Sequence, residues 1–153
     1  MDGEPMKVCI VSSCGGHLTE VRALRGAYAR YPHHYVLNDY AELPDDMRDC
    51  TRFISHSERD WRFFVNLWEA ASILRRERPE VLLSTGAGPI VPFSLVARFF
   101  FPRVRIVYIE TLTRVTRPSM TGRIMYHLTR DFYYQWPQLA PWFPRAKCGG
   151  LVL

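Results

Sequence analysis

The chain has 153 residues, which suits one domain with a complete core, and its hydrophobic fraction of 48% excludes a generally disordered protein. The formal charge is +5, and Lys7 and Lys147 are the only lysines, so the positive charge is carried by arginine, whose planar fork of donors suits phosphate. Nucleic acid is the weaker choice of partner, because the sequence has no zinc-finger spacing, RNA-recognition motif, or basic helix followed by heptads.

The first half of the sequence alternates strand and helix patterns. Met6–Ser12 is apolar and β-branched, which predicts a buried strand, and it ends in a Ser-Ser-Cys-Gly-Gly turn. A helix is expected over His17–Arg30, because apolar residues recur on one face. Short strands are predicted at Tyr35–Leu37 and Thr51–Ser55.

A longer helix is predicted over Asp60–Arg78, where Pro79 stops it. Five apolar residues recur along it at helical spacing: Trp61, Phe64, Trp68, Ala71 and Leu74. Core packing is the simpler interpretation of this stripe.

The second half continues the alternation. The predicted elements are a strand at Val81–Ser84, a helix at Ile90–Phe101, a strand at Val104–Ile109, a helix at Thr121–Thr129, a strand at Asp131–Gln135, and an extended tail from Pro137. Strands that alternate with helices imply an α/β fold of Rossmann-like type, with a mostly parallel sheet covered on both faces. No domain boundary is visible, so residues 1–153 are expected to form a single domain.

Three predicted strands end in polar or glycine-rich segments, at Ser12–His17, Thr85–Pro89 and Glu110–Arg117. The carboxyl ends of parallel strands lie at one edge of a sheet, where ligands of such folds bind. The sequence therefore predicts one site built from three distant segments.

The first of these segments leads into a helix. Gly15 and Gly16 let the backbone approach a ligand, and a helix N-terminus favours an anion such as diphosphate, although a structural turn explains the pattern equally well. Neither GxGxxG nor a Walker loop is present. His17 could take a proton from a sugar hydroxyl or could simply bond to backbone at the helix start, and Glu20 could complete the N-terminal cap.

The other two segments offer similar choices. Gly86 and Gly88 precede a helix and could hold a diphosphate or sugar, or form a plain tight connection. Glu110 could bind sugar hydroxyls or act as a base, and Arg114 and Arg117 could neutralise a diphosphate. A structural Glu–Arg pair is the alternative.

The helix at Ile90–Phe101 is apolar nearly all round, so it is either fully buried or a partly exposed wedge in a lipid interface. The wedge would use Phe93, Val96, Phe99, Phe100 and Phe101. Arg98, Arg103 and Arg105 flank it and could reach headgroups. No apolar run is long enough to span a membrane, no signal peptide is expected, and the four cysteines form no CxxC pair, which suggests a reducing cytosolic setting.

The motif SSCGGHLTE (Ser12–Glu20) resembles the opening of the acceptor-binding, membrane-anchor subunit of split lipid-linked sugar transferases. That family has a eukaryotic asparagine-linked glycosylation branch and a bacterial exopolysaccharide glucuronosyltransferase branch. Three more blocks match it in order: STGAGPIVPF (Ser84–Phe93), YIETLTRVTRPSMTG (Tyr108–Gly122) and QWPQLAPWFPRAKCGG (Gln135–Gly150). The family is also similar to the N-terminal half of the peptidoglycan lipid-linked N-acetylglucosaminyltransferase, although Cys14 stands where that pattern has a small residue.

The resemblance implies the N-terminal half of an inverting GT-B glycosyltransferase. His17 or Glu110 would be the catalytic base, and the acceptor diphosphate would lie against Ser13, Gly15, Gly16, Gly86, Gly88, Arg114 and Arg117. A polyprenyl-diphosphate-linked sugar would be the acceptor, and neither a cofactor nor a metal is expected. The alternative is a membrane adaptor that performs no chemistry and recruits a catalytic partner.

The same resemblance predicts the setting of the reaction. A UDP-sugar-binding partner would complete a heterodimer, docking against a tail at residues 136–153, and the protein would sit peripherally on the cytoplasmic face of the membrane. The few residues before the first strand favour the bacterial branch, with glucuronic acid as the first choice of donor sugar and N-acetylglucosamine as the second.

Overall fold

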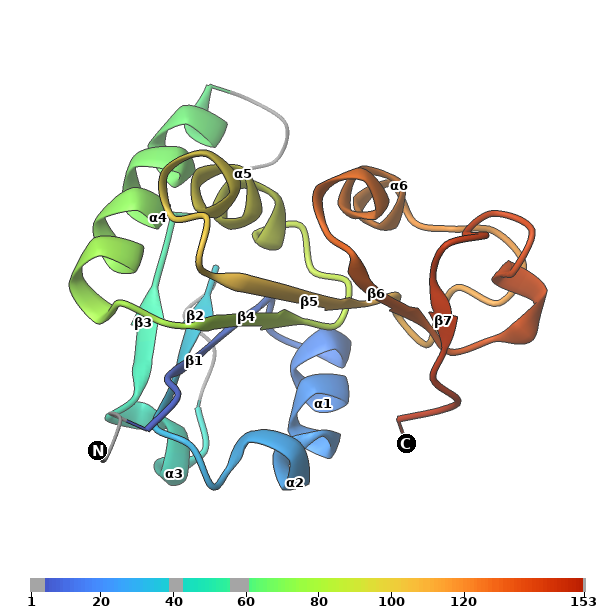
Figure 1. Cartoon of the computed structure of the whole chain (residues 1–153). Helices are drawn as coiled ribbons and strands as arrows, with labels where there is room; N and C mark the ends of the chain where they lie inside the picture. The colour runs from blue at the N-terminus through green and yellow to red at the C-terminus, as the bar shows by residue number, and fades with distance from the viewer. Residues whose placement is uncertain (1–4, 39–42, 56–60, 153) are drawn as a thin grey trace.

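In the computed structural model, which describes residues 5–38, 43–55 and 61–152, the chain forms one parallel sheet with helices on both faces (Figure 1). The strand order is β3-β2-β1-β4-β5-β6-β7. The strands are β1 (Val8–Ser12), β2 (His33–Leu37), β3 (Thr51–Phe53), β4 (Val81–Ser84), β5 (Arg105–Ile109), β6 (Asp131–Tyr134) and β7 (Lys147–Cys148). The predicted Rossmann-like α/β fold is confirmed.

The helices form two layers. They are α1 (Gly16–Ala23), α2 (Arg25–Tyr28), α3 (Asp45–Arg48), α4 (Arg62–Glu77), α5 (Ile90–Phe100), α6 (Met120–Leu128) and the short 3₁₀ helix η1 (Pro137–Leu139). Figure 1 shows α4, α5 and α6 above the sheet and α1, α2 and α3 below it. The prediction of one helix over His17–Arg30 is wrong, because Leu24, at φ −81° and ψ 5°, separates α1 from α2.

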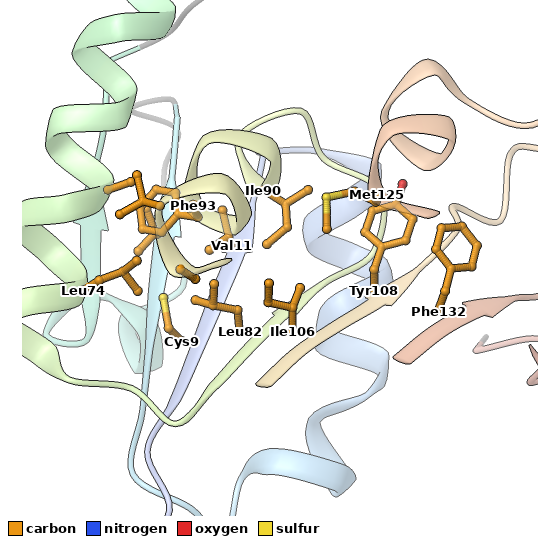
Figure 2. Close-up of a cluster of buried hydrophobic side chains, with 14 of the residues drawn as sticks. Cys9, Val11, Leu74, Leu82, Ile90, Phe93, Ile106, Tyr108, Met125 and Phe132 are labelled. Carbon is orange, nitrogen blue, oxygen red and sulfur yellow. The ribbon is translucent and has the colours of Figure 1, made fainter. Parts of the chain in front are cut away.

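The central strand β1 supplies both halves of the core. Cys9 and Val11 join the cluster beneath α4–α6 (Figure 2). Val8 and Ile10 join the other cluster, on the α1–α3 side of the sheet. Because both faces are covered, every position of β1 is buried, which explains its unbroken apolar run.

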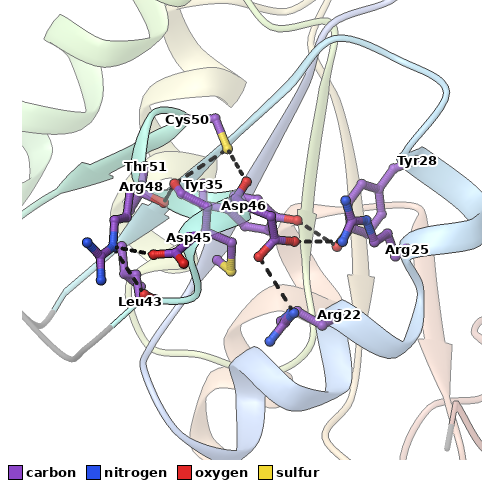
Figure 3. A network of polar contacts seen from close by, with 11 residues as sticks. Arg22, Arg25, Tyr28, Tyr35, Leu43, Asp45, Asp46, Arg48, Cys50 and Thr51 are labelled. Carbon is purple, nitrogen blue, oxygen red and sulfur yellow. Dashed lines mark hydrogen bonds and ion pairs between the residues drawn. The ribbon is translucent and has the colours of Figure 1, made fainter.

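On the α1–α3 face, polar contacts at the surface join the helices to one another and to β3 (Figure 3). Asp46 of α3 accepts a hydrogen bond from Arg25 at 2.6 Å and lies 3.9 Å from Arg22 of α1. The hydroxyl of Thr51 donates to the carbonyl of Met47 at 2.6 Å and holds the end of α3 against β3. Short α3 has no apolar periodicity of its own, so it could not be predicted from a pattern of residues.

The α4–α6 face differs, because it leaves large apolar side chains in solvent. Trp61, which is the N-cap residue of α4, and Phe64 and Trp68 on the helix itself are 71%, 72% and 73% exposed. Only Leu74 of the predicted core stripe is fully buried, and the buried side of α4 instead runs through Asn66 and Ala70. The core-packing interpretation of the aromatic stripe is therefore wrong, since these rings lie on the side of α4 that faces away from the sheet.

The predicted wedge on α5 divides into buried and exposed residues. Phe93 and Val96 belong to the core and Phe101 is half-buried, so the prediction that Phe93 and Val96 form a lipid-contacting surface is wrong. Phe99 and Phe100, on the last turn, are 74% and 75% exposed. No helix within the described ranges is both long enough and apolar enough to cross a bilayer.

The C-terminal segment is more ordered than the predicted extended tail. Leu139 and Phe143 are buried in the core beneath α6, and β7 pairs in parallel with β6. The amide of Val152 donates to the side-chain oxygen of Gln135 at 3.0 Å. Much of the segment 136–153 is therefore part of the domain itself.

Candidate functional site

The three segments predicted to form one site do meet at the carboxyl edge of the sheet. The ring nitrogen Nδ1 of His17 lies 3.0 Å from the carbonyl oxygen of Thr85, and the hydroxyl of Thr85 donates to the carbonyl of His17 at 3.0 Å. A Cβ on Gly86 would stand 2.9 Å from Cβ of Thr111 and 3.2 Å from Cε1 of His17. The loops after β1, β4 and β5 therefore touch one another.

The glycines of the site have different roles. Gly86 has φ 109°, a backbone conformation that favours glycine, and it is buried. It therefore allows the loops to pack closely and does not expose its amide to a ligand. Gly15, Gly16 and Gly88 are exposed. Gly15, at φ 90°, is the N-cap of α1 and has no side chain with which to cap the helix, so the first amides of α1 face the open edge of the sheet.

The contact with Thr85 fixes the tautomer of the His17 ring. A carbonyl oxygen only accepts hydrogen bonds, so Nδ1 carries the hydrogen in this contact. In the neutral ring the lone pair then belongs to Nε2. A half-buried histidine held in this way presents a proton acceptor of fixed orientation at the edge of the sheet.

Glu20 has a role that the sequence did not indicate. The sequence suggested that Glu20 caps the N-terminus of α1, but α1 has no side-chain cap. Glu20 is instead buried, and its carboxylate reaches the loop after β5. Its carboxylate accepts hydrogen bonds from the hydroxyl of Thr111 at 2.7 Å, the amide of Leu112 at 3.1 Å and the side-chain nitrogen of Gln135 at 3.3 Å. Glu20 therefore fixes the start of the loop that carries Arg114 and Arg117.

Two tryptophans hold the same loop from the other side. The indole of Trp136 donates to the carbonyl of Leu112 at 2.7 Å, and that of Trp142 donates to the carbonyl of Thr116 at 3.2 Å. Both predicted phosphate ligands, Arg114 and Arg117, are exposed, and neither makes an ion pair with any residue that the structure describes. Their guanidinium groups are therefore available to an anion.

Glu110 lies beneath the first turn of α6 and has no exposed surface. Neither carboxylate oxygen has a hydrogen-bond partner of good geometry within the described ranges. Residue 122 must be glycine for the Glu110 side chain to fit, because a Cβ on Gly122 would stand 1.5 Å from Oε2 of Glu110. The prediction of Glu110 as a base or sugar ligand is not supported by this placement, because an acceptor hydroxyl cannot reach the carboxylate.

Burial raises the pKa of Glu110 above its ordinary value, while the hydroxyl of Ser119, the nearby backbone amides and the charge of Arg114 act in the opposite direction. The native state therefore holds the proton more tightly than the unfolded chain does. The stability contributed by this group is greatest at low pH and falls as the pH rises from the ordinary glutamate value through the raised one.

The variant Glu110→Gln is expected to be more stable than the parent at neutral pH, because glutamine is neutral at every pH whereas burial disfavours the charged form of Glu110. Urea unfolding of both proteins between pH 4 and pH 8 measures this difference. We expect the two stability curves to diverge as the pH rises. Parallel curves would show that Glu110 does not titrate abnormally.

A cavity of about 440 Å³ opens beside the first loop. Ser13 and Gly88 line it from the loops at the edge of the sheet, and Asn66 lines it from α4. The apolar part of the wall comes from Phe63, Val91, Pro92, Met120 and Ile124. The cavity thus runs from the polar loops toward the exposed apolar surface of α4, α5 and α6.

Comparison with known proteins identifies the family. Residues 51–152 match the family model described as "Oligosaccharide biosynthesis protein Alg14 like". The chain belongs to the Alg14-like family. The expected kinship with subunits of lipid-linked sugar transferases is thereby confirmed.

Full-length relatives agree with this assignment. Over 98% of this chain and 84% of the relative, the Alg14-like chain is 28% identical to the human "UDP-N-acetylglucosamine transferase subunit ALG14". It is 26% identical to the subunit of the same name from Mus musculus over the same shares of the two chains. The relatives are thus named as subunits of a glycosyltransferase, as predicted.

Solved structures match the Alg14-like fold at low identity. The UDP-N-acetylglucosamine 2-epimerase of Rickettsia bellii superimposes with a TM-score of 0.72 at 12% identity, covering 97% of this chain and 45% of that one. Acinetobacter baumannii MurG gives a TM-score of 0.69 at 12% identity, covering 88% of this chain and 43% of that one. The chain therefore spans less than half the length of these proteins, and the predicted half of a GT-B fold is confirmed.

Within the described part of the Alg14-like chain, no three or more His, Cys, Asp or Glu side chains gather in a way that could hold a metal ion. All four cysteines are free thiols, and Cys9 is fully buried in the core. The polar groups at the edge of the sheet that are open to a ligand include His17, the first backbone amides of α1, and the exposed Arg114 and Arg117.

Proposed function

We propose that this chain is the acceptor-binding subunit of a two-subunit inverting glycosyltransferase, which moves a sugar from a UDP-sugar to a polyprenyl-diphosphate-linked saccharide. The observation that carries the proposal is the position of His17, whose Nε2 is an oriented proton acceptor beside the open N-terminus of α1. A base and an anion site in one place suit an acceptor that has both a hydroxyl and a diphosphate.

In the proposed reaction the acceptor hydroxyl oxygen attacks the anomeric carbon of the donor while its proton passes to Nε2 of His17. The bond from that carbon to the UDP oxygen breaks on the opposite side, which inverts the anomeric centre. The partner subunit would stabilise the departing UDP. The ring orientation set by Thr85 makes His17 a better candidate than the buried Glu110.

The acceptor diphosphate would lie at the first turn of α1, near Gly15 and Gly16, with Arg114 and Arg117 supplying charge. Glu20 and the two tryptophans support this role, because they fix the arginine-bearing loop without neutralising it. The first isoprene units of the lipid would occupy the 440 Å³ cavity, whose wall is mainly apolar beyond the polar loops.

The curated relatives bear on the donor sugar. Their names specify UDP-N-acetylglucosamine, which reverses the order predicted from the sequence and places N-acetylglucosamine ahead of glucuronic acid. We therefore propose N-acetylglucosamine as the transferred sugar.

The membrane would meet the α4–α6 face. Seven exposed large apolar side chains belong to or adjoin these three helices: Trp61, Phe64, Trp68, Phe99, Phe100, Met120 and Ile124. Such a concentration on one face, opposite a face that carries ion pairs, supports peripheral attachment to a membrane. We propose that the protein lies on the cytoplasmic side of that membrane. The same surface also favours the second candidate, a membrane adaptor that leaves all chemistry to its partner.

The partner would dock beside the C-terminal segment. An apolar groove of about 360 Å³ lies between this segment and the sheet, lined by Leu83, Val107, Ile109, Tyr133 and Val152 among others. Leu151, next to it, is 54% exposed. We propose this groove and the end of the tail as the heterodimer contact.

The purified chain alone is expected to transfer no sugar from UDP-N-acetylglucosamine to a polyprenyl-diphosphate-linked N-acetylglucosamine, because one GT-B half forms only one wall of the cleft. Adding a UDP-sugar-binding partner should restore turnover. A radiolabelled-donor assay with and without the partner measures this. Turnover by the isolated chain would overturn the two-subunit proposal.

A further inference from the structure

A second groove lies at the opposite edge of the sheet from His17. It has a volume of about 330 Å³ and is formed by the ends of α5 and α6 and the starts of β5 and β6. Its charged and titratable lining consists of Arg98, Arg105, Arg130, Arg145, Asp131, His127 and Tyr126. Four arginines against one aspartate leave a strong excess of positive charge, which the proposed transfer reaction does not use.

Two of these arginines are held in place by neighbours. Arg105 donates to both carboxylate oxygens of Asp131, at 2.7 and 3.0 Å, so the single acidic group is already occupied. Arg145 lies 4.7 Å from the centre of the Tyr126 ring, and its Nε donates to the hydroxyl of Tyr126 at 3.3 Å. These contacts order the wall of the groove.

The other two arginines are free. Arg98 and Arg130 are exposed, and within the described ranges neither makes an ion pair. Guanidinium groups gathered without acidic partners are suited to a phosphate group. The groove thus has two fixed and two unpaired cationic side chains around one space.

The neighbours of Arg98 distinguish between possible sources of phosphate. Phe99 and Phe100 follow it in the chain on the last turn of α5 and are 74% and 75% exposed. They lie outside the lining of the groove, and Phe100 lines a separate pocket between the ends of α4 and α5. A soluble phosphate would contact only the arginines, whereas a phospholipid would place its headgroup among them and its acyl region against the two rings. The arrangement of charge next to exposed aromatic surface therefore favours a lipid.

We propose that the arginine groove (Arg98, Arg105, Arg130 and Arg145) binds the phosphate of an anionic phospholipid headgroup while Phe99 and Phe100 enter the adjoining acyl region. This inference rests on the proposed membrane attachment and adds to it a headgroup site separate from the acceptor site. Attachment should therefore depend on the charge of the membrane as well as on its apolar interior.

Flotation of the full chain with vesicles tests the proposal. Vesicles of phosphatidylcholine alone are compared with vesicles containing 30% phosphatidylglycerol, at low and high salt. The variant R98Q/R130Q is expected to bind the anionic vesicles about 25-fold more weakly, from a factor of roughly five for each arginine near an anionic surface. Its binding to neutral vesicles should not change, and high salt should remove the difference.

A control variant, R30Q/R48Q, removes the same charge from the α1–α3 side, where Arg30 and Arg48 are exposed. It should retain full preference for anionic vesicles, and the variant F99S/F100S should bind both kinds more weakly. Thermal unfolding followed by circular dichroism confirms that each variant is folded.

The other outcomes separate the possible failures. If wild-type protein binds neither kind of vesicle, the membrane attachment in the proposed function is wrong as well. If R98Q/R130Q keeps the anionic preference, or loses no more than the control, the headgroup site alone is wrong. The protein is also titrated with inorganic phosphate. If it binds phosphate tightly but binds anionic and neutral vesicles equally, the groove is a site for a soluble anion and the proposal is wrong.

Discussion

The variant His17→Ala is expected to lower the turnover of the assembled two-subunit enzyme by about 10²–10⁴-fold, the usual contribution of a general base. The reason is geometric, because Nδ1 bonds to the carbonyl of Thr85 and leaves Nε2 as the acceptor at the edge of the sheet. The measurement is single-turnover transfer with saturating donor and acceptor, which separates chemistry from binding.

The variant His17→Gln distinguishes proton transfer from positioning. A glutamine amide can donate to the carbonyl of Thr85, but it cannot take a proton from a sugar hydroxyl. Activity should therefore stay as low as in His17→Ala, while acceptor affinity and the complex with the partner remain intact. If glutamine restores most of the rate, His17 only positions the acceptor, and the membrane-adaptor function gains support.

The variant Gly86→Ala is expected to destabilise the fold by about 2–5 kcal/mol, combining the cost of a side chain at positive φ with that of overpacking. The backbone of Gly86 has φ 109°, and the new Cβ would stand 2.9 Å from Cβ of Thr111 and 3.3 Å from its amide nitrogen. Neither neighbour is the free end of a flexible chain, so the loops after β4 and β5 must separate. Urea unfolding at neutral pH gives the change directly.

Gly88→Ala is the matched control for stability. Gly88 is exposed, is not at positive φ, and has nothing within 4 Å of the position of an added Cβ. Its unfolding free energy should stay within about 0.5 kcal/mol of the parent, as for ordinary surface substitutions. Equal stability of the two variants would mean that the three loops are not packed against one another as described.

The strands and the longer helices were predictable because burial on both sheet faces leaves a clear pattern. Continuous apolar runs marked β1 and β4, and Pro79 marked the end of α4. The same reasoning failed for Trp61 and Trp68, because helical spacing shows that residues share a side of the helix but not that the sheet covers that side. Short α3 and β7 depend on contacts with distant residues and have no pattern of their own.

The location of the candidate site could be predicted from the sequence, but the contacts of some of its side chains could not. Turns after parallel strands predicted that the loops of His17, Gly86 and Glu110 would meet at one edge. The sequence could not show that Glu110 points under α6 or that Glu20 crosses to the loop after β5, because both depend on which side of an element faces a neighbour. Side chains that fix a loop through single hydrogen bonds leave no periodic signal.

The strand order also determines when the domain can form. β1 lies between β2 and β4, and Val8 pairs with Val81, so the central strand has one open edge until β4 has been synthesised. Contacts between residues so far apart in sequence slow folding, and an open strand edge favours association with other chains. A truncated chain that stops before β4 therefore presents β1, which is buried at every position in the complete fold, as an unpaired edge.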